Sequence, residues 1–349
     1  MYSSLVSDTI EGAFIELIDG SIWAIKGFTH PKNGLICFPK YIPVLDGYRV
    51  KGIYRYNRLS GLSEMWSVIR DRYKHYISFS EVYDRVVPII PLNMIKHFYS
   101  PVNKTLEVVR KTPSSPIYRD LRDFILLLCS EAGIPLSRIG ISGSLLVGIV
   151  GEESDIDLVV YGREYGLKVY NALKRLHIRG VEVSRLTEKY ILRLYQERVK
   201  DTKMLFKVFS SLESRKILQG TFRNRMYFIR LLKYDKQIEY GRLKFKSLGK
   251  VIVRAKIVDT SESIFTPCTY SIEVLEVAEG DRRALLAIKL YSLRGRFCEL
   301  VWDGAEVLIQ GRLEQCIDLD SDETYYQISV NDPGDIIIPI RREINPLQP

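Results

Sequence analysis

The sequence lacks long apolar runs, paired cysteines and clustered histidines, and each absence excludes a class of protein. No apolar stretch approaches the roughly 20 residues needed to cross a bilayer, so we predict no membrane partner. The N-terminus has no basic start followed by an apolar core, so we predict no signal peptide. The five cysteines include no CxxC pair and the four histidines have no ligand spacing, which argues against a zinc site or a disulfide framework. We therefore expect a reducing, cytoplasmic location.

Charge is unevenly distributed along the chain. The 349 residues carry a formal net charge of +9, and 46% hydrophobic with 27% charged residues is ordinary globular composition. Residues 1–112 carry +5, residues 113–240 carry +7 and residues 241–349 carry −3. A basic surface attracts polyanions such as nucleotides, nucleic acid or acidic lipid heads. The bland alternative is a solvated surface of a charge-rich protein.

Periodicity divides the chain into three predicted domains. Residues 1–112 alternate mainly as β-strands, with Asp19-Gly20 predicting a type I′ hairpin and the proline-rich run 82–101 predicted to be irregular. The segment "KTPSSP" at 111–116 has linker composition and closes this mainly-β domain.

The other two domains differ in their periodicity. Residues 113–240 are predicted to be α/β, with a long basic helical stretch over 186–220. Residues 241–349 contain five strand-like runs separated by short turns, which predicts a small OB-like β-barrel. Such barrels often bind oligonucleotides, although a domain that serves only structural packing fits the same pattern. The predicted fold class is a multidomain α+β chain with a central α/β domain.

The segment 139–162 combines a phosphate-binding turn with a carboxylate pair. A short strand is predicted to end at Gly143, where the backbone can approach a phosphate and the Ser144 hydroxyl can donate to it. Asp155 and Asp157 follow at the head of an apolar strand, where side chains at i and i+2 share a face. Two close carboxylates repel each other unless a cation lies between them. Since Mg²⁺ prefers oxygen ligands bridged to substrate phosphates, the pattern predicts metal-dependent phosphoryl transfer.

These residues resemble the signature of the DNA polymerase beta nucleotidyltransferase superfamily. The resemblance rests on Gly143-Ser144 followed by "SDIDLVV" at 154–160. It implies a central nucleotidyltransferase domain in which Gly143 and Ser144 bind a nucleoside triphosphate. It also implies that Asp155 and Asp157 are the catalytic residues and hold Mg²⁺ or Mn²⁺. The implied activity is nucleotidyl transfer to an acceptor such as an RNA end, a protein or a small molecule. A surface turn and a strand with two exposed aspartates is the competing interpretation.

Members of this superfamily normally have a third carboxylate on a neighbouring strand. The strand-like run around Arg230 carries no acid. Candidates for the third carboxylate are Glu182, Asp235 and Glu239, each of which could instead be an ordinary surface acid. Members without the third acid can be non-catalytic. The alternatives are therefore a non-catalytic nucleotide- or RNA-binding protein on the same fold, or a protein-interaction scaffold.

A basic stretch lies next to this motif in the sequence. Residues 185–236 hold 14 basic and 5 acidic side chains with aromatics interleaved, a combination that nucleic-acid backbones and bases favour. Arg223, Arg225 and Arg230 are the candidate nucleic-acid contacts. An amphipathic helix with core aromatics and solvated cations would give the same composition.

Overall fold

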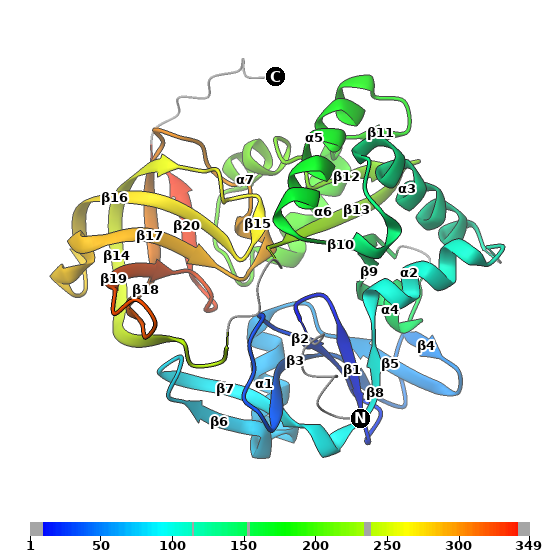
Figure 1. The fold of residues 1–349 in the computed structure, drawn as a ribbon, viewed down its shortest axis with the longest axis horizontal. Coiled ribbons are helices and arrows are strands. Elements are labelled where there is room, and N and C mark those ends of the chain that lie inside the picture. The colour runs from blue at the N-terminus through cyan, green and yellow to red at the C-terminus, as the bar shows by residue number, and fades with distance from the viewer. Residues whose placement is uncertain (1–9, 114, 152–153, 234–238, 341–349) are drawn as a thin grey trace. The chain divides into compact units, whose positions relative to one another are not determined.

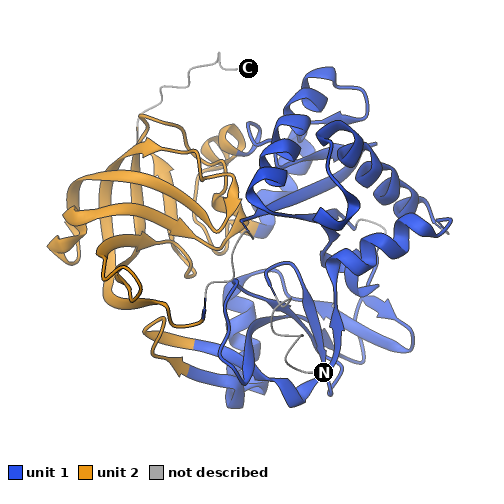
Figure 2. Ribbon diagram, viewed as in Figure 1, with its two compact units in different colours: residues 1–78, 87–197, 213–239 blue, residues 79–86, 198–212, 240–349 orange. Residues whose placement is uncertain are grey.

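The structure, a computed structural model, describes residues 10–340 except 114, 152–153 and 234–238, and is a mixed α+β chain with several sheets (Figure 1). Two compact units are present (Figure 2): residues 1–78, 87–197 and 213–239 form the first, and residues 79–86, 198–212 and 240–349 form the second. The predicted boundary at 240/241 falls one residue from a border between the units, and the predicted boundary at 112/113 lies inside the first unit. In the described part of the chain, no helix is long and apolar enough to cross a membrane.

The N-terminal sheet of the first unit has the strand order β4-β5-β3-β2-β1-β8, with β7 pairing the other part of β3 and β6 pairing β7. The strands are β1 Phe14–Leu17, β2 Ile22–Ile25, β3 Gly34–Pro43, β4 Arg49–Lys51, β5 Tyr54–Arg58, β6 Ile77–Ser80, β7 Arg85–Pro91 and β8 Ile95–Tyr99. Helix α1, Leu62–Arg72, contacts β3. Trp23 is fully buried in this core, and the rings of Tyr73 and Tyr76 meet it edge-on.

Two predictions for residues 1–112 were wrong in detail, and one helix was missed. The Asp19-Gly20 hairpin forms, but only Gly20 has a positive φ (83°), so the turn is not type I′. Residues 82–101 are not irregular, because they contain β7 and β8, and the fully buried Ile90 outweighs the hydrogen bonds that prolines cannot make. Helix α2, Pro101–Arg110, was not predicted, although Ser100 caps it by accepting from the Asn103 amide and proline occupies its first turn.

The central sheet of the first unit carries the motif. Its strand order is β11-β12-β13-β10-β9, and β10 runs parallel to β13 but antiparallel to β9. The strands are β9 Ile139–Ile141, β10 Ile156–Tyr161, β11 Val183–Ser184, β12 Gln219–Phe222 and β13 Arg225–Leu232. Helices α3, Pro116–Ala132, and α5, Arg163–Arg179, contact each other, and α5 contacts β10 and β13.

The two faces of β10 have different neighbours. Ile156 pairs with Tyr227 of β13, whose ring lies 4.8 Å from that of Phe124 in α3, so this face is covered by helices. Val159 and Tyr161 share the opposite face with Asp157, and they form a cluster with Ile10 from the segment before β1. The N-terminal part of the first unit therefore covers the face that carries Asp157.

The basic stretch 186–220 is not one helical segment as predicted. Helix α6 covers Glu188–Arg198 and helix α7 covers Phe206–Glu213, with residues 199–205 between them. Residues 198–212 belong to the second unit, where the Asp201 side chain pairs with Arg294 and the Asp201 carbonyl accepts a hydrogen bond from the Gly334 amide. These tertiary contacts outweigh the local helical preference.

The sheet of the second unit closes on itself. Strand β14, Leu243–Asp259, pairs with both β16, Cys268–Glu279, and β18, Glu306–Asp318. Strand β17, Ala287–Ser292, joins β16 to β19, Thr324–Ser329, and β19 returns to β18. Only the β17–β19 pair among these is parallel. The buried residues of this barrel, such as Val253, Ile257 and Leu290, form its own core.

Candidate functional site

Gly143 lies directly against the carboxylate of Asp157. Strand β9 ends at Ile141, and the Ser142 amide donates to the Asp157 carbonyl at 2.8 Å, which holds the turn beside the head of β10. The Ser142 hydroxyl donates to the Gly12 carbonyl at 2.7 Å. Gly143 has φ +62°, and a Cβ built on it would lie 2.1 Å from Oδ2 of Asp157. Only glycine leaves room for the carboxylate here.

The short helix α4, Gly143–Val147, follows this turn and places Ser144 next to it. Ser144 is buried, with 8% of its surface exposed. The helix ends at Gly148, which also has a positive φ, 76°. The structure thus brings the predicted nucleotide-binding pair, Gly143 and Ser144, to the same place as Asp157.

Asp155 and Asp157 are half-buried, and the charge of Asp157 acts on Asp155. Burial, and then the charge of Asp157, raises the pKa of Asp155 to about 6. Burial also raises the pKa of Asp157, against the opposing charges of Arg230 and Arg58. The site therefore favours addition of a cation, either a proton or a metal ion, over two bare carboxylates.

The surroundings of the aspartates fit a hard cation. Within the described residues, no side chain donates a hydrogen bond to either carboxylate, and Arg193 approaches Asp155 only to 3.8 Å. Mg²⁺ is commonly held by one or two carboxylates together with substrate phosphates and water, so the pair would suffice to bind it. Among the same residues no three acids, histidines or cysteines come together as a metal-binding group.

Two cations of the N-terminal sheet lower the pKa of Asp157 by their charge. Lys40 of β3 is charged less readily than usual, because burial and the nearby Arg58 lower its pKa to about 7, and Asp157 only partly offsets this. Burial opposes the charge of Arg58 of β5, but Glu197 and the aspartates raise its pKa overall. Neither cation was identified from the sequence, because both lie on strands about 100 residues before the motif. Positive charge opposite a carboxylate pair is suited to a polyphosphate.

Helix α6 contributes an arginine and a glutamate, Arg193 and Glu197, that the sequence did not reveal as site residues. Arg193 lies 3.8 Å from Asp155 and 3.7 Å from Glu197, one turn further along the helix. The charge of Glu197 raises the pKa of both aspartates. The only sequence signal for this pair was its i,i+4 spacing on a basic helix.

The segment between α4 and β10 is anchored by two arginines. Arg49 of β4 donates to the Ile149 carbonyl at 3.2 Å and to the Ser154 hydroxyl at 3.1 Å. Arg225 of β13 donates to the Ser154 carbonyl at 3.2 Å. Both arginines therefore position the residue immediately before Asp155.

The three arginines predicted to contact nucleic acid are engaged by carboxylates of the chain. Arg223 pairs with Asp123 and Glu182, both at 2.6 Å. Arg225 lies 3.5 Å from Asp120. Arg230 lies 3.3 Å from the buried Glu11, which Lys26 also contacts at 2.8 Å. Their charges are largely compensated inside the fold.

Of the candidates for the third carboxylate, Glu182 lies apart from the aspartate pair. Glu182 precedes β11, and both β12 and β13 separate β11 from β10 in the sheet. Glu239 is exposed on the loop after β13. Asp235 lies outside the described residues. On β13 itself, Phe228 pairs with Asp157, so the neighbouring strand presents no acid at this point.

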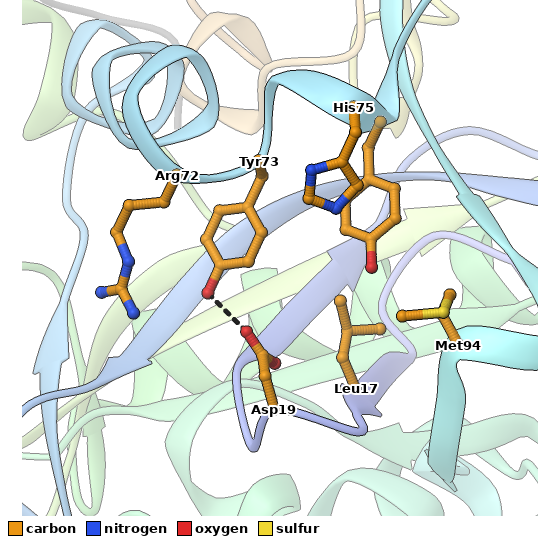
Figure 3. Close-up of a pocket in the computed structure, with 7 residues that line it drawn as sticks. Leu17, Asp19, Arg72, Tyr73, His75 and Met94 are labelled. Carbon is orange, nitrogen blue, oxygen red and sulfur yellow. Dashed lines mark hydrogen bonds between the residues drawn. The ribbon is translucent and has the colours of Figure 1, made fainter.

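A pocket of ≈ 260 Å³ lies elsewhere in the first unit (Figure 3). It is lined by Leu17, Asp19, Arg72, Tyr73, His75, Tyr76 and Met94. The Tyr73 hydroxyl donates to Asp19 at 2.8 Å, as Figure 3 shows. The pocket shares no residue with the aspartate site, so the two features are independent.

A known protein is similar in sequence to most of this chain. Uncharacterized protein MJ1086 of Methanocaldococcus jannaschii is 24% identical over 327 residues, which cover 91% of this chain and 94% of that protein. No family model matches the chain. No solved structure matches it significantly. The similarity runs along nearly the whole of both chains, and the name of that protein describes no activity.

Proposed function

We propose that this chain transfers a nucleotidyl group from a nucleoside triphosphate to an acceptor, in the manner of the DNA polymerase beta superfamily. The observation that carries the proposal is the close approach of the Gly143 backbone to the Asp157 carboxylate, which places Ser144 and the two aspartates at one turn. Phosphates need compensating positive charge where they bind. Lys40 and Arg58 can supply such charge, since both lower the pKa of Asp157.

The proposed reaction is a displacement at the α-phosphorus of the triphosphate. An acceptor oxygen forms the new bond, the bond from the α-phosphorus to the bridging oxygen breaks, and pyrophosphate leaves while the acceptor proton passes to water. Asp155 and Asp157 would hold Mg²⁺ or Mn²⁺, which when bound neutralises charge on the triphosphate. Ser144 would donate to a phosphate oxygen, and Lys40 and Arg58 would compensate the remaining negative charge.

A non-catalytic nucleotide-binding role is the second candidate. It is favoured by one observation: among the described residues, no third acid completes a metal-binding group with the pair. Phe228 stands next to Asp157 on β13, where the superfamily normally has a carboxylate. A binder would gain stability from nucleotide without releasing pyrophosphate, which separates the two candidates.

The barrel of the second unit supports an OB-like assignment. Its order β14-β16-β17-β19-β18 closes back on β14, with the third and fifth strands of the barrel in sequence, β17 and β19, parallel. We infer a five-stranded barrel of the type that often binds oligonucleotides.

Thermal melts across a nucleotide titration test the metal site. With Mg²⁺ and nucleoside triphosphate at a hundredfold excess over the dissociation constant, the wild type should gain about 2.7 kcal/mol. Asp157→Asn should lose the metal-dependent part of this gain, because a neutral amide is a poor ligand for a hard cation. Ser144→Ala should weaken binding by roughly 1.5–3 kcal/mol, the value of one hydrogen bond to a charged group.

The matched control is Asp303→Asn, which changes an exposed aspartate of the second unit. The Asp303→Asn variant should gain the same stability from nucleotide as the wild type, both with Mg²⁺ and with chelator. Equal nucleotide-induced gains in the wild type and Asp157→Asn would reject the metal site. Pyrophosphate release, measured in the same samples with labelled nucleotide and cellular RNA or protein, distinguishes transfer from binding.

A further inference from the structure

The first unit contains a pocket that the proposed transfer does not use. Its lining comes from the turn between β1 and β2, the end of α1, the 3-10 helix η2 Lys74–Tyr76 and the 3-10 helix η3 Leu92–Met94 (Figure 3). Its volume is ≈ 260 Å³, whereas pockets for drug-sized ligands have about 300–1,000 Å³. The pocket therefore suits a molecule smaller than a nucleotide.

Two opposite charges line this pocket without pairing with each other. Oδ1 of Asp19 accepts from the amide and the hydroxyl of Ser21 at 2.9 and 2.6 Å, and Oδ2 accepts from the Tyr73 hydroxyl at 2.8 Å. A carboxylate has about four acceptor positions, so Asp19 retains one on Oδ2. Arg72 is exposed, and its guanidinium lies 5.7 Å from the centre of the Tyr73 ring. Among the described residues, Arg72 forms no hydrogen bond or ion pair, and Asp19 forms no ion pair. Both charges are thus available to a ligand that carries the complementary charges.

The hydroxyl of Tyr76 is a third available group. Tyr76 lines the pocket and is 5% exposed, and its hydroxyl has no hydrogen-bond partner among the described residues. Its oxygen is not fully enclosed, because the fully enclosed unpaired side-chain atoms in the described part of the chain are Nε of Arg122 and Nδ1 of His177. Burial, and then the charge of Asp19, raises the pKa of Tyr76, so the carboxylate acts on this hydroxyl. Since buried polar groups nearly always have a partner, the unpaired hydroxyl indicates that a ligand supplies one.

The two tyrosine rings of the pocket leave little room for a stacked ligand. The rings of Tyr73 and Tyr76 are inclined by 10° with their centres 6.1 Å apart, and each meets Trp23 edge-on. Both residues are only 5% exposed. A nucleobase binds by stacking on an open ring face, so the pocket does not favour one. Leu17 and Met94 complete the lining with apolar surface, which favours an aliphatic or thioether group.

We propose that this pocket binds a free α-amino acid with an apolar side chain. The ammonium group, which has three donors, donates to Asp19 and to the Tyr76 hydroxyl. The carboxylate pairs with Arg72, since a guanidinium binds carboxylates through charge-assisted hydrogen bonds. The side chain packs against Leu17 and Met94. Asp19 and Arg72 together carry no net charge, and neither does a zwitterion, so ligand and pocket match in charge.

Isothermal titration calorimetry of the full chain with leucine and with methionine tests the proposal. At least one of them should bind with a Kd below about 1 mM, and binding of neither would overturn the proposal. The amine that lacks the carboxylate and the acid that lacks the amine, isoamylamine and isocaproic acid for leucine, should each bind at least about tenfold more weakly, because each loses a charge-assisted contact. Equal binding of the acid would identify an anion site, and equal binding of the amine a cation site. Either result would reject a zwitterionic ligand.

Substitutions in the lining test the three contacts. Arg72→Gln and Asp19→Asn should each weaken binding at least about tenfold, and Tyr76→Phe about threefold to tenfold. The matched control is Arg70→Gln, which changes an exposed arginine of the same helix outside the lining and should bind like the wild type. If Asp19→Asn does not fold, Arg72→Gln and Tyr76→Phe decide. Wild-type affinity in these two variants would overturn the proposal.

Stability and nucleotide binding give independent readouts. Without amino acid, Tyr76→Phe should melt like the wild type, whereas Tyr73→Phe should melt lower because it loses the hydrogen bond to Asp19. A lower melting temperature of Tyr76→Phe would overturn the assignment of its hydroxyl to the ligand. The metal-dependent gain with nucleoside triphosphate should be unchanged in Arg72→Gln, since the pocket shares no residue with the aspartate site. Amino-acid binding without any nucleotide effect in the wild type would reject the proposed transfer and leave the pocket standing.

Discussion

At the scale of the residue, two glycines at the ends of α4 share a backbone conformation but differ in their surroundings. Gly143 has φ +62° and Gly148 has φ +76°, a region that other residues rarely adopt. A Cβ on Gly143 would overlap the Asp157 carboxylate, whereas one on Gly148 would meet nothing within 4 Å. Substitutions at the two glycines therefore separate the free-energy cost of the left-handed backbone from the cost of a steric overlap.

Gly148→Ala should destabilise the protein by about 1–2 kcal/mol, the conformational cost alone. Gly143→Ala should cost more than this and should also displace the Asp157 carboxylate. We expect the metal-dependent gain with nucleotide to disappear in Gly143→Ala and to persist in Gly148→Ala. Urea denaturation and nucleotide-dependent melts measure the two effects, and retention of the gain in both variants would contradict the close approach.

At the scale of the element, a single buried carboxylate links the segment before β1 to the central sheet. The side chain of Glu11 is 1% exposed, lies 2.8 Å from Lys26 and 3.3 Å from Arg230 of β13, and accepts from the Gly27 amide at 3.1 Å. Burial opposes its ionisation, but Lys26 and Arg230 lower its pKa overall. The charge of Arg230 also lowers the pKa of Asp157. The ion pair of Glu11 with Arg230 therefore connects the segment before β1 to the ionisation of Asp157.

Glu11→Gln should destabilise the protein by about 2–4 kcal/mol at neutral pH, because it removes one partner from a buried ion pair. The lowered pKa of Glu11 contributes stability above the ordinary value near 4.5, and this contribution is lost as the pH falls through the folded-state pKa. The variant should therefore show a shallower loss of stability on acidification. Urea denaturation as a function of pH measures both effects.

Glu107→Gln is the control, because Glu107 pairs with Lys104 and Lys111 at 3.1 and 3.0 Å but is 44% exposed. Its loss should change the free energy of unfolding by less than about 1 kcal/mol. If Glu11→Gln were equally mild, the link between the two sheets would not depend on this charge.

At the scale of the whole molecule, the second unit recruits pieces from two earlier parts of the chain. Residues 79–86 contribute Asp84, which accepts from the Ser247 amide, and Arg85, which pairs with Asp332. Residues 198–212 contribute Leu212 to the core of the barrel. The barrel strands themselves all lie within 243–329.

A fragment of residues 240–349 should fold cooperatively, because all the strands of the closed barrel are present. Adding a peptide of residues 198–212 should raise its melting temperature, since the peptide binds the folded state through Leu212 and through Asp201, which pairs with Arg294. The same peptide with Leu212→Asp should give no increase. An unfolded fragment would show that the barrel depends on the rest of the chain.

Local signals account for the elements that were predicted correctly. The strand 156–161 is apolar except for Asp157, and the five predicted runs of residues 241–349 correspond to β14, β16, β17, β18 and β19. The signals for α2 were also present, at Ser100 and Pro101, but the preceding prolines concealed them. The interruption of the basic helix after Arg198 had no local cause, because Asp201 is held by residues almost 100 positions later.

The sequence by itself determined the chemistry of this protein's candidate site, since Gly143, Ser144, Asp155 and Asp157 lie within 15 residues and their spacing follows from strand and turn geometry. Only the tertiary structure decided what surrounds them. Lys40 and Arg58 lower the pKa of Asp157 by their charge from another sheet, and carboxylates from other elements compensate Arg223 and Arg230. Backbone geometry acts over a few residues, whereas electrostatic fields and burial depend on neighbours that only the folded chain brings together.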